Sequence, residues 1–315
     1  MTDSRPDTPE PTLEEAAPGV FAYLQLHGQW GLNNAAFITA AGGPSGHGST
    51  TLIDTCCTER RARALRDTLA RTSPDAPVRV LINTHHHGDH THGNYLFNPV
   101  AIIGHERCRE EIIATGLGTT AVWPDTDWGH IEIVPPNVTF TDRITTYAGD
   151  LELQLIYVGP AHTTNDIIAW LPEHRIVFAG DTVFNGGTPF CVFGSLSGSL
   201  AALEVIRSLA PKTIVPGHGP LCGPEALDTI EAYLTFVAET AAEGHAAGVT
   251  PLDLARQTPL PDPFAALHDS ERFVANLHRA YSELDGAPPG TALPMPAIFP
   301  DMVAYNGGKM PACLA

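Results

Sequence analysis

The sequence has few basic residues, few cysteines and no long apolar run. Lys and Arg number 17 against 35 Asp and Glu, so the 315-residue chain has a formal net charge of −18. Phosphate backbones and anionic membranes both attract basic surface, so this charge argues against nucleic acid and membranes as partners. No apolar run reaches the ~20 residues that cross a bilayer, and no spanning helix is expected.

The cysteines also limit the choice of function. Six are present, without regular spacing or a Cys-x-x-Cys pair: Cys56, Cys57, Cys108, Cys191, Cys222 and Cys313. The first 17 residues are acidic and Pro-rich, and lack the basic start and apolar stretch of a secretory signal. We therefore expect a cytoplasmic protein with reduced thiols, most of them packed as small hydrophobic side chains.

One stretch stands out against this background. Residues 84–94 have the sequence Thr-His-His-His-Gly-Asp-His-Thr-His-Gly-Asn and follow an apolar run at 78–82 that has the composition of a buried strand. A polar surface tract would need neither the strand nor the embedded Asp. Imidazole nitrogens and carboxylate oxygens are ligands that zinc prefers, so the motif and its context together predict a metal site.

The spacing inside the motif predicts two adjacent metal sites. His85 and His87 are two residues apart in an extended segment and point to the same side. The turn at Gly88 directs Asp89 and His90 to a second point nearby. The loop cannot complete either site alone, so further ligands must come from elsewhere in the chain.

Three other apolar runs end in residues able to bind a metal. His162 follows the run 151–158, Asp181 follows 175–179, and His218 follows 213–215. A lone His or Asp after a strand is usually an ordinary loop residue. Ligand residues after four separate strands instead predict one shared metal centre at the strand ends.

These motifs, with Asp54 after the run at 51–53, resemble in order those of the metallo-β-lactamase superfamily over residues 18–235. The resemblance implies a four-layer αβ/βα sandwich of the α/β class. It implies that His85, His87 and His162 bind the first metal, that Asp89, His90 and His218 bind the second, and that Asp181 bridges both. It also implies that Asp54 orients the metal loop without binding metal. Two zinc ions fit best, although iron and manganese use the same ligand types.

The expected organisation has three parts: a disordered tail at 1–17, a catalytic domain at 18–235, and a helical extension with an apolar tail at 236–315, packed on the same domain. Helices are expected at 59–71, 106–115, 199–209, 226–247, 252–258 and 270–283. Strands are expected at 19–26, 35–39, 51–54, 78–82 and 100–103, and within 138–158 and 166–179.

Aromatic and basic side chains suggest where a substrate would bind. Several aromatic residues lie in segments expected near the metals, where they could line an apolar pocket or simply pack: Trp30, Trp123, Trp128, Phe184, Phe190 and Phe193. The helix at 59–71 carries much of the scarce positive charge, with Arg60, Arg61, Arg63, Arg66 and Arg71. It is either a solvated face or a docking site for an acidic partner. Cys56 and Cys57 lie near Asp54 and could approach the metals.

The chemistry follows from a site of this kind. Two metals that share Asp181 can lower the pKa of a water from ~15.7 towards 7 and can polarise a carbonyl, which suits hydrolysis of a thioester or stabilisation of an enolate. No Gly-x-Ser-x-Gly motif is present, so a covalent acyl-enzyme is not expected. Asp89 is expected to move protons. The bridging Asp181 makes the site more similar to glyoxalase II than to the best-known β-lactamases, which use a Cys ligand.

A narrower resemblance covers residues 161–172 and 180–199, which look like the cyclase/thioesterase enzymes of actinorhodin-type aromatic polyketide biosynthesis. It implies a polyketide cyclase that closes a ring by an aldol step, with thioester hydrolysis as a further activity. The substrate would be a small molecule or a chain on an acyl carrier protein docked at the arginine helix. A glyoxalase II-like thioesterase, a lactone or ester hydrolase and a β-lactamase-like hydrolase are the alternatives. The sequence leaves open whether the chain is a homodimer.

Overall fold

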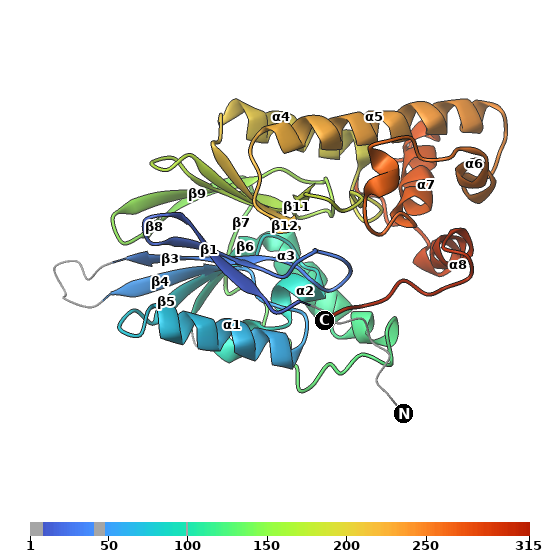
Figure 1. Cartoon of the computed structure of the whole chain (residues 1–315). Helices are drawn as coiled ribbons and strands as arrows, with labels where there is room; N and C mark the ends of the chain where they lie inside the picture. Colours follow the sequence, from blue (N-terminus) through green and yellow to red (C-terminus); the bar gives the residue numbers. More distant parts are fainter. Residues whose placement is uncertain (1–8, 41–47, 99) are drawn as a thin grey trace.

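The computed structural model describes residues 9–40, 48–98 and 100–315. Two β-sheets lie face to face, and helices cover the outer face of each. Figure 1 shows α1 (Glu59–Thr72) on one outer face, and α4 (Leu196–Ser208) and α5 (Glu225–Ala246) on the other. This is the four-layer αβ/βα sandwich that the motifs predicted.

The first sheet has seven strands among the described residues, in the order of the sequence. They are β1 (Thr12–Ala17), β2 (Val20–Leu24), β3 (Ala35–Ala40), β4 (Ser49–Ile53), β5 (Val78–Ile82), β6 (Ala101–His105) and β7 (Val138–Phe140). β1 to β4 are antiparallel, and β4 to β7 are parallel. The parallel strands carry the crossover helices α1 and α3 (Glu106–Thr115) on one face.

The second sheet has the order β12–β11–β10–β9–β8. Its strands are β8 (Arg143–Ala148), β9 (Leu151–Tyr157), β10 (Ile167–Leu171), β11 (Ile176–Phe184) and β12 (Thr213–His218). β11 and β12 are parallel, so their carboxyl ends meet at the same edge. The apolar side chains between the sheets form one core, which includes Ile38, Ile82, Leu155 and Phe178.

Two expectations about strand limits were wrong. The tail expected at 1–17 includes β1, which pairs antiparallel with β2 because Gly19, at a φ of 74°, turns the chain back on itself; residues 1–8 lie outside the described part. The strand expected to end at Ala179 continues to Phe184, because β11 pairs with β12 as far as Phe184 and His218. Asp181 therefore lies within a strand, not after one.

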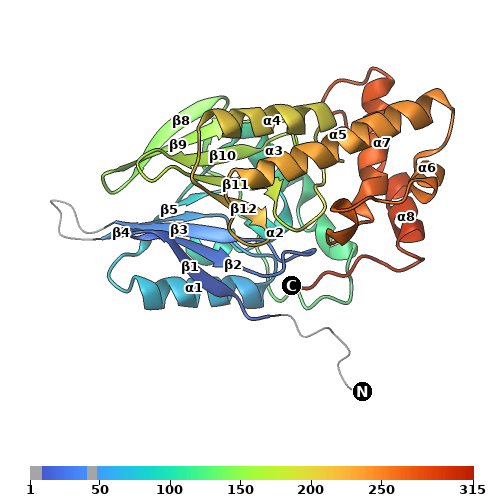
Figure 2. The same ribbon diagram turned by 45° about the horizontal axis from the view of Figure 1, so that its top comes forward.

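The C-terminal helices are α6 (Pro251–Gln257), α7 (Arg272–Leu284) and α8 (Met295–Tyr305). α6 and α7 share one apolar core with α4 and α5. Figure 2 shows α4 and α5 over the second sheet, with α7 and α6 beside the end of α5. α5 runs without interruption through residue 235, so the domain boundary expected there falls inside a helix. α8 was expected only as an apolar tail. Its Ile298 and Met302, one helical turn apart, are buried.

The last residues of the chain lie beside the loop that joins β2 to β3. The Leu314 amide donates to the Trp30 carbonyl at 2.9 Å, and the Trp123 indole donates to the Pro311 carbonyl at 2.7 Å. This places the C-terminal segment beside the loop between β2 and β3. None of the described helices is long and apolar enough to cross a membrane.

Candidate metal centre

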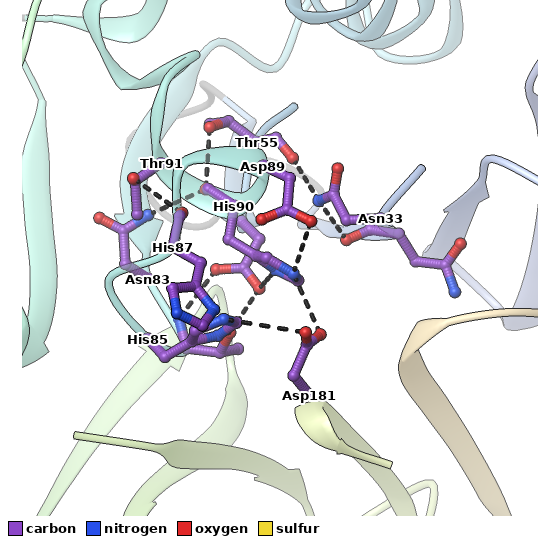
Figure 3. A network of polar contacts seen from close by, with 12 residues as sticks. Asn33, Thr55, Asn83, His85, His87, Asp89, His90, Thr91 and Asp181 are labelled. Atoms are coloured by element: carbon purple, nitrogen blue, oxygen red, sulfur yellow. Dashed lines mark hydrogen bonds and ion pairs between the residues drawn. The ribbon is translucent and has the colours of Figure 1, made fainter. Parts of the chain in front are cut away.

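The predicted ligands come together where the two sheets meet. The loop after β5 enters the short helix α2 (Gly88–Thr91), while β11 and β12 bring Asp181 and His218 from the other sheet. Figure 3 shows His85, His87, His90 and Asp181 pointing toward a common centre, with Asp89 beside it. The strand ends thus bring together residues that are more than 130 positions apart in the sequence.

The first group of possible ligands is His85, His87, His162 and Asp181. His162 Nε2 lies 2.8 Å from His87 Nδ1 and 3.3 Å from Asp181 Oδ2. His85 Nε2 lies 3.9 Å from the same Asp181 oxygen. These ligand atoms could hold one metal ion.

The second group is Asp89, His90 and His218. His218 Nε2 lies 3.3 Å from Asp89 Oδ2 and 3.3 Å from Asp181 Oδ2, and His90 Nε2 lies 3.1 Å from Asp181 Oδ1. The Asp181 carboxylate therefore lies between the two groups. That is the position that a carboxylate bridging two metals would occupy.

Hydrogen bonds at the outer ring nitrogens set the direction of four imidazoles. Nδ1 of His90 donates to Asp54 Oδ2 at 2.9 Å, Nδ1 of His218 donates to the Gly28 carbonyl at 3.0 Å, and Nδ1 of His162 donates to the Phe190 carbonyl. The Thr84 hydroxyl, which donates to Asp54, accepts from Nδ1 of His85 at 3.1 Å. Each ring then presents Nε2 to the centre, as metal-binding histidines do.

Polar atoms without hydrogen bonds point into this centre. His85 Nε2, His90 Nε2 and Asp181 Oδ1 are buried and make no hydrogen bond among the described residues. Leaving a buried polar atom unpaired costs about 1–3 kcal/mol. Three such atoms directed at one point fit a site built for a cation.

The charge of the centre supports the same conclusion. Burial lowers the pKa of His85 and of His87, so these imidazoles are neutral and can donate a lone pair. Burial alone would also lower the pKa of His218, but the carboxylates of Asp181 and Asp89 raise it to about 9. Asp181, Asp54 and Asp89 likewise raise the pKa of His90 against the effect of burial. The carboxylates of this centre thus favour positive charge beside them, which a divalent cation would supply.

Asp54 has the position expected of it. It lies at the end of β4 with a φ of 58°, is nearly inaccessible, and accepts hydrogen bonds from the Thr84 amide at 2.8 Å and the Thr84 hydroxyl at 2.6 Å besides that from His90. It therefore contacts the metal loop at both ends. His86, inside the motif, belongs to neither group, and its Nδ1 lies 3.0 Å from the Asn165 amide nitrogen.

The aromatic residues expected to line a substrate pocket have different roles. Phe184 packs flat against His218 at 5.3 Å, and with exposures of 4% and 5% Phe184 and Phe190 are packing residues. Phe193 is 37% exposed, and its ring meets that of His87 at 5.2 Å. Of these three, only Phe193 offers a substantial surface to a substrate.

The tryptophans divide in the same way. Trp30 contacts Phe190 and Trp123, at ring distances of 5.3 and 5.6 Å, and is half-buried. Trp128 instead contacts His92, which belongs to neither group of ligands, and its indole donates to the Trp123 carbonyl. The Glu59 amide, at the start of α1, donates to the Trp128 carbonyl. Trp128 therefore has a structural role in the loop behind the centre.

The docking role considered for Arg61 was wrong. Arg61 is 3% exposed and donates to Gln25 Oε1 at 2.8 Å and to the Leu314 carbonyl at 3.1 Å, so it is unavailable to a docking partner. Its position on the inner face of α1, next to Ala62 and Leu65, explains the burial. Cys56 and Cys57 are buried, as expected of most of the thiols, and neither belongs to the ligand groups.

Sequence reasoning missed an asparagine network that supports the metal loop. Asn83 and Asn94 exchange hydrogen bonds at 3.1 and 2.8 Å, and Thr55 Oγ1 donates to the His90 carbonyl at 2.9 Å. Their positions at the two ends of the motif were the available signal. Asn33 adds a bond to the Thr55 carbonyl at 2.7 Å.

The fold and site together define a metallohydrolase-type protein with two groups of side chains that could hold metal ions. Residues 28–218 match the family model of the metallo-beta-lactamase superfamily, which covers more than half of the chain. The protein belongs to this superfamily, whose members are metal-dependent hydrolases.

Individual relatives are varied. The chain is 30% identical over 165 residues to the alpha subunit of 2,4-dinitroanisole O-demethylase from Nocardioides sp. (strain JS1661), covering 50% of this chain and 45% of that protein. It is 26% identical to acyl-coenzyme A thioesterase MBLAC2 of Bos taurus, with coverages of 52% and 64%. It is 29% identical to a hydroxyacylglutathione hydrolase of Rhodospirillum rubrum, with coverages of 46% and 47%. The matched region is thus about half to two thirds of these relatives.

Solved structures agree on the fold. A metallo-beta-lactamase from Pontibacter korlensis superposes with a TM-score of 0.58 at 20% identity, covering 72% of this chain and 99% of that one. DIM-1 metallo-beta-lactamase superposes with a TM-score of 0.57 at 16% identity, covering 73% of this chain and 99% of that one. At these identities the likeness concerns the fold alone.

Proposed function

We propose that this protein is a dinuclear metal-dependent enzyme that hydrolyses an activated acyl bond, with a thioester as its substrate class. The observation that carries the proposal is the place of Asp181, within 3.3 Å of His162 Nε2 on one side and within 3.3 Å of His218 Nε2 on the other. A shared carboxylate between two sets of ligands supports two metals rather than one. Zinc is the metal of choice, and elemental analysis separates it from iron and manganese.

Two bound cations would supply Lewis acidity and an activated water. His85, His87 and His162 would hold the first, and Asp89, His90 and His218 the second. Asp54 and the backbone carbonyls of Gly28 and Phe190 keep the imidazoles in the required tautomer. The protein residues thus define the geometry of the centre before a substrate arrives.

Asp89 is the carboxylate best placed to move a proton. Its side chain is 20% exposed, against 4% for Asp181 and for Asp54. A substrate can therefore reach Asp89, whereas it cannot reach Asp54. In thioester hydrolysis, water adds hydroxide to the acyl carbon, the carbon–sulfur bond breaks, and the departing sulfur takes the proton that Asp89 removes from the water.

The relatives support this substrate class. One is named an acyl-coenzyme A thioesterase, and another a hydroxyacylglutathione hydrolase. Both names describe hydrolysis of a thioester. Phe193, exposed beside His87, would favour an apolar or aromatic acyl group over a short polar one.

The proposal is tested on the purified chain with its metal content measured. Acyl thioesters of increasing chain length, including an aryl β-keto acyl thioester, are assayed by release of the free thiol, beside a matched oxygen ester and a β-lactam. Two metals per chain and release from the thioesters are expected. A protein that binds two metals but cleaves only the β-lactam or the ester contradicts the substrate class, and one that binds no metal contradicts the centre.

The second candidate is ring closure of a poly-β-keto acyl chain by an aldol step, as in a type II polyketide cyclase. The observation that favours it is the exposed ring of Phe193 beside His87, with Phe190 between it and Trp30, an aromatic group that suits a flat, folded chain. In the aldol step a carbon beside one carbonyl loses a proton and bonds to another carbonyl carbon, which becomes an alcohol. No thiol is released and the mass is unchanged until water leaves, so mass spectrometry of the same assay separates the two reactions.

A further inference from the structure

A buried face of α7 holds the loop that follows β11. This loop, Thr188–Val192, runs past the metal centre and carries Phe190. Three polar residues of α7 are at most 2% exposed: Arg272, Asn276 and Arg279. They are four and three residues apart, so they lie along one side of the helix. Polar side chains are rarely so buried without a partner, and here the loop backbone is the partner.

The first contact is at the start of the loop. The Arg272 guanidinium donates to the Thr188 carbonyl at 3.1 Å and pairs with Asp269 at 3.0 Å. It also lies over the Trp30 ring, 4.1 Å from its centre. Just before α7, the His268 carbonyl accepts from the Thr188 amide at 2.9 Å, so the loop is attached here by backbone and side chain together.

The central contact surrounds Phe190. Nδ2 of Asn276 donates to the Pro189 carbonyl at 2.7 Å, and Oδ1 accepts from the Cys191 amide at 3.0 Å. One side-chain amide thus binds the residues on both sides of Phe190. Two bonds from a planar group leave the intervening residue little freedom to rotate.

The last contact is at the end of the loop. The Arg279 guanidinium donates to the carbonyls of Val192 and Thr291. From Arg272 to Arg279 the helix advances about 10 Å, and the five residues 188–192, with four steps between them, reach at most about 14 Å. The loop is therefore long enough to lie along this part of the helix, and each contact constrains a different part of the loop.

The middle of the loop contacts a candidate ligand. The Phe190 carbonyl, whose flanking residues Asn276 holds, accepts the hydrogen bond from Nδ1 of His162. That bond keeps the proton of His162 on Nδ1 and directs Nε2 at His87 and Asp181. A rotation of the Phe190 peptide would remove the acceptor and free the ring to turn.

We infer that Asn276, with Arg272 and Arg279 beside it, is a positioning residue for the metal centre, acting on His162 through the Phe190 carbonyl. The inference rests on the proposed function, because it takes His162 as a metal ligand. It assigns the C-terminal helix α7 a part in metal binding, although α7 lies outside the region 28–218 that matches the family model. Hydrogen bonds behind a ligand of this kind typically contribute 10- to 100-fold to metal affinity.

The test compares Asn276→Leu with Tyr281→Phe. The leucine has the branched shape of asparagine and the same number of side-chain heavy atoms, but it can bond neither Pro189 nor Cys191. Tyr281 is on the same helix and donates to the Val249 carbonyl at 2.9 Å, away from the loop, so its replacement is the matched control. Zinc affinity is measured by competition with a chelator, the cobalt(II)-substituted protein gives a spectrum of ligand geometry, and thermal unfolding of the metal-free protein reports the cost in stability.

The expected result is that Asn276→Leu weakens one of the two zinc equivalents by about tenfold or more and changes the cobalt spectrum, while Tyr281→Phe keeps both. Unchanged affinity and spectrum in Asn276→Leu overturn the inference but leave the proposed function standing. A wild-type chain that binds no zinc overturns both. If the leucine variant does not fold, Asn276→Asp decides by the same criteria, because it keeps the bond from Cys191 and cannot donate to Pro189.

Discussion

Asp54 Oδ2 accepts a hydrogen bond of 2.9 Å from His90 Nδ1, and the opposite nitrogen of the same ring lies 3.1 Å from Asp181 Oδ1. A carboxylate that no substrate can reach thus determines which nitrogen of His90 faces the centre. The same carboxylate binds the amide and the hydroxyl of Thr84, next to His85. One residue at the end of β4 therefore orients members of both ligand groups.

Replacement of Asp54 by asparagine is expected to weaken metal binding. In one orientation the new amide places its NH2 group against His90 Nδ1, and the proton of His90 then moves to Nε2, the nitrogen that should bind metal. In the other orientation the NH2 group faces the Thr84 amide, and that hydrogen bond is lost. Zinc affinity should fall about 10- to 100-fold in a chelator competition. Asp301→Asn removes a carboxylate that pairs with His278 at 2.8 Å, away from the centre, and is the control. Equal affinities in the two variants contradict the role of Asp54.

Gly217 is expected to tolerate no side chain. A Cβ there would lie 1.9 Å from Asp181 Oδ1 and 2.6 Å from the Gly180 carbonyl carbon, so Gly217→Ala must push the Asp181 carboxylate away. We expect a loss of about 1–3 kcal/mol in the free energy of unfolding together with reduced metal content. At Gly118 an added Cβ would meet its nearest atom at 3.9 Å, which makes Gly118→Ala the control. Full metal content in Gly217→Ala would refute the proposed place of Asp181.

Cys313, in the C-terminal segment, should be a more reactive thiol than Cys222. A hydrogen bond from Cys57 lowers the pKa of Cys313 to about 7, whereas burial raises the pKa of Cys222 to about 12. Both thiols are half-buried, so exposure does not separate them. The thiolate is the nucleophile. Alkylation of Cys313, followed by mass spectrometry, should therefore rise with pH to half its limit near pH 7, while Cys222 stays unmodified up to pH 9. In Cys57→Ala the midpoint should move up; an unmoved midpoint contradicts the contact.

The grouping of the candidate ligand residues could be predicted from the sequence, and the physical reason is local. One loop carries His85, His87, Asp89 and His90. Because this loop directly follows a strand, its side chains gather at one edge of the sheet, and this does not depend on what the sheet packs against. The roles of Arg272 and Asn276 could not be predicted in this way. Their sequence shows only polar residues at helical spacing, and whether such a face meets water or a loop backbone depends on how distant parts of the chain pack. Arg61 was misjudged for the same reason.

The exposed arginines of α1 provide a separate test of an acyl carrier protein as partner. Arg60 is exposed and Arg66 half-buried, whereas Arg63 pairs with Glu59 at 2.6 Å. If an acidic carrier docks here, Arg60→Glu with Arg66→Glu should reduce kcat/KM for a carrier-bound thioester about tenfold or more at low salt, because like charges repel. The rate on a small thioester should be unchanged. Arg256→Glu, an equally exposed change on α6, is the control. Equal losses in both variants, or none in either, exclude docking at α1.

Asp89 is expected to matter more for turnover than for the fold. Its side chain lies 3.3 Å from His218 Nε2 and is the most exposed carboxylate of the centre, so an asparagine keeps the shape but cannot take up a proton. At zinc concentrations that restore full metal content, Asp89→Asn should lower kcat by about 100-fold or more, with a small change in the unfolding midpoint. Asp285→Asn breaks an exposed pair with His245 and should leave kcat and the unfolding midpoint unchanged. Normal turnover in the metal-loaded Asp89→Asn protein would show that the proton moves through another group. Turnover lost only in step with metal content would make Asp89 a ligand and nothing more.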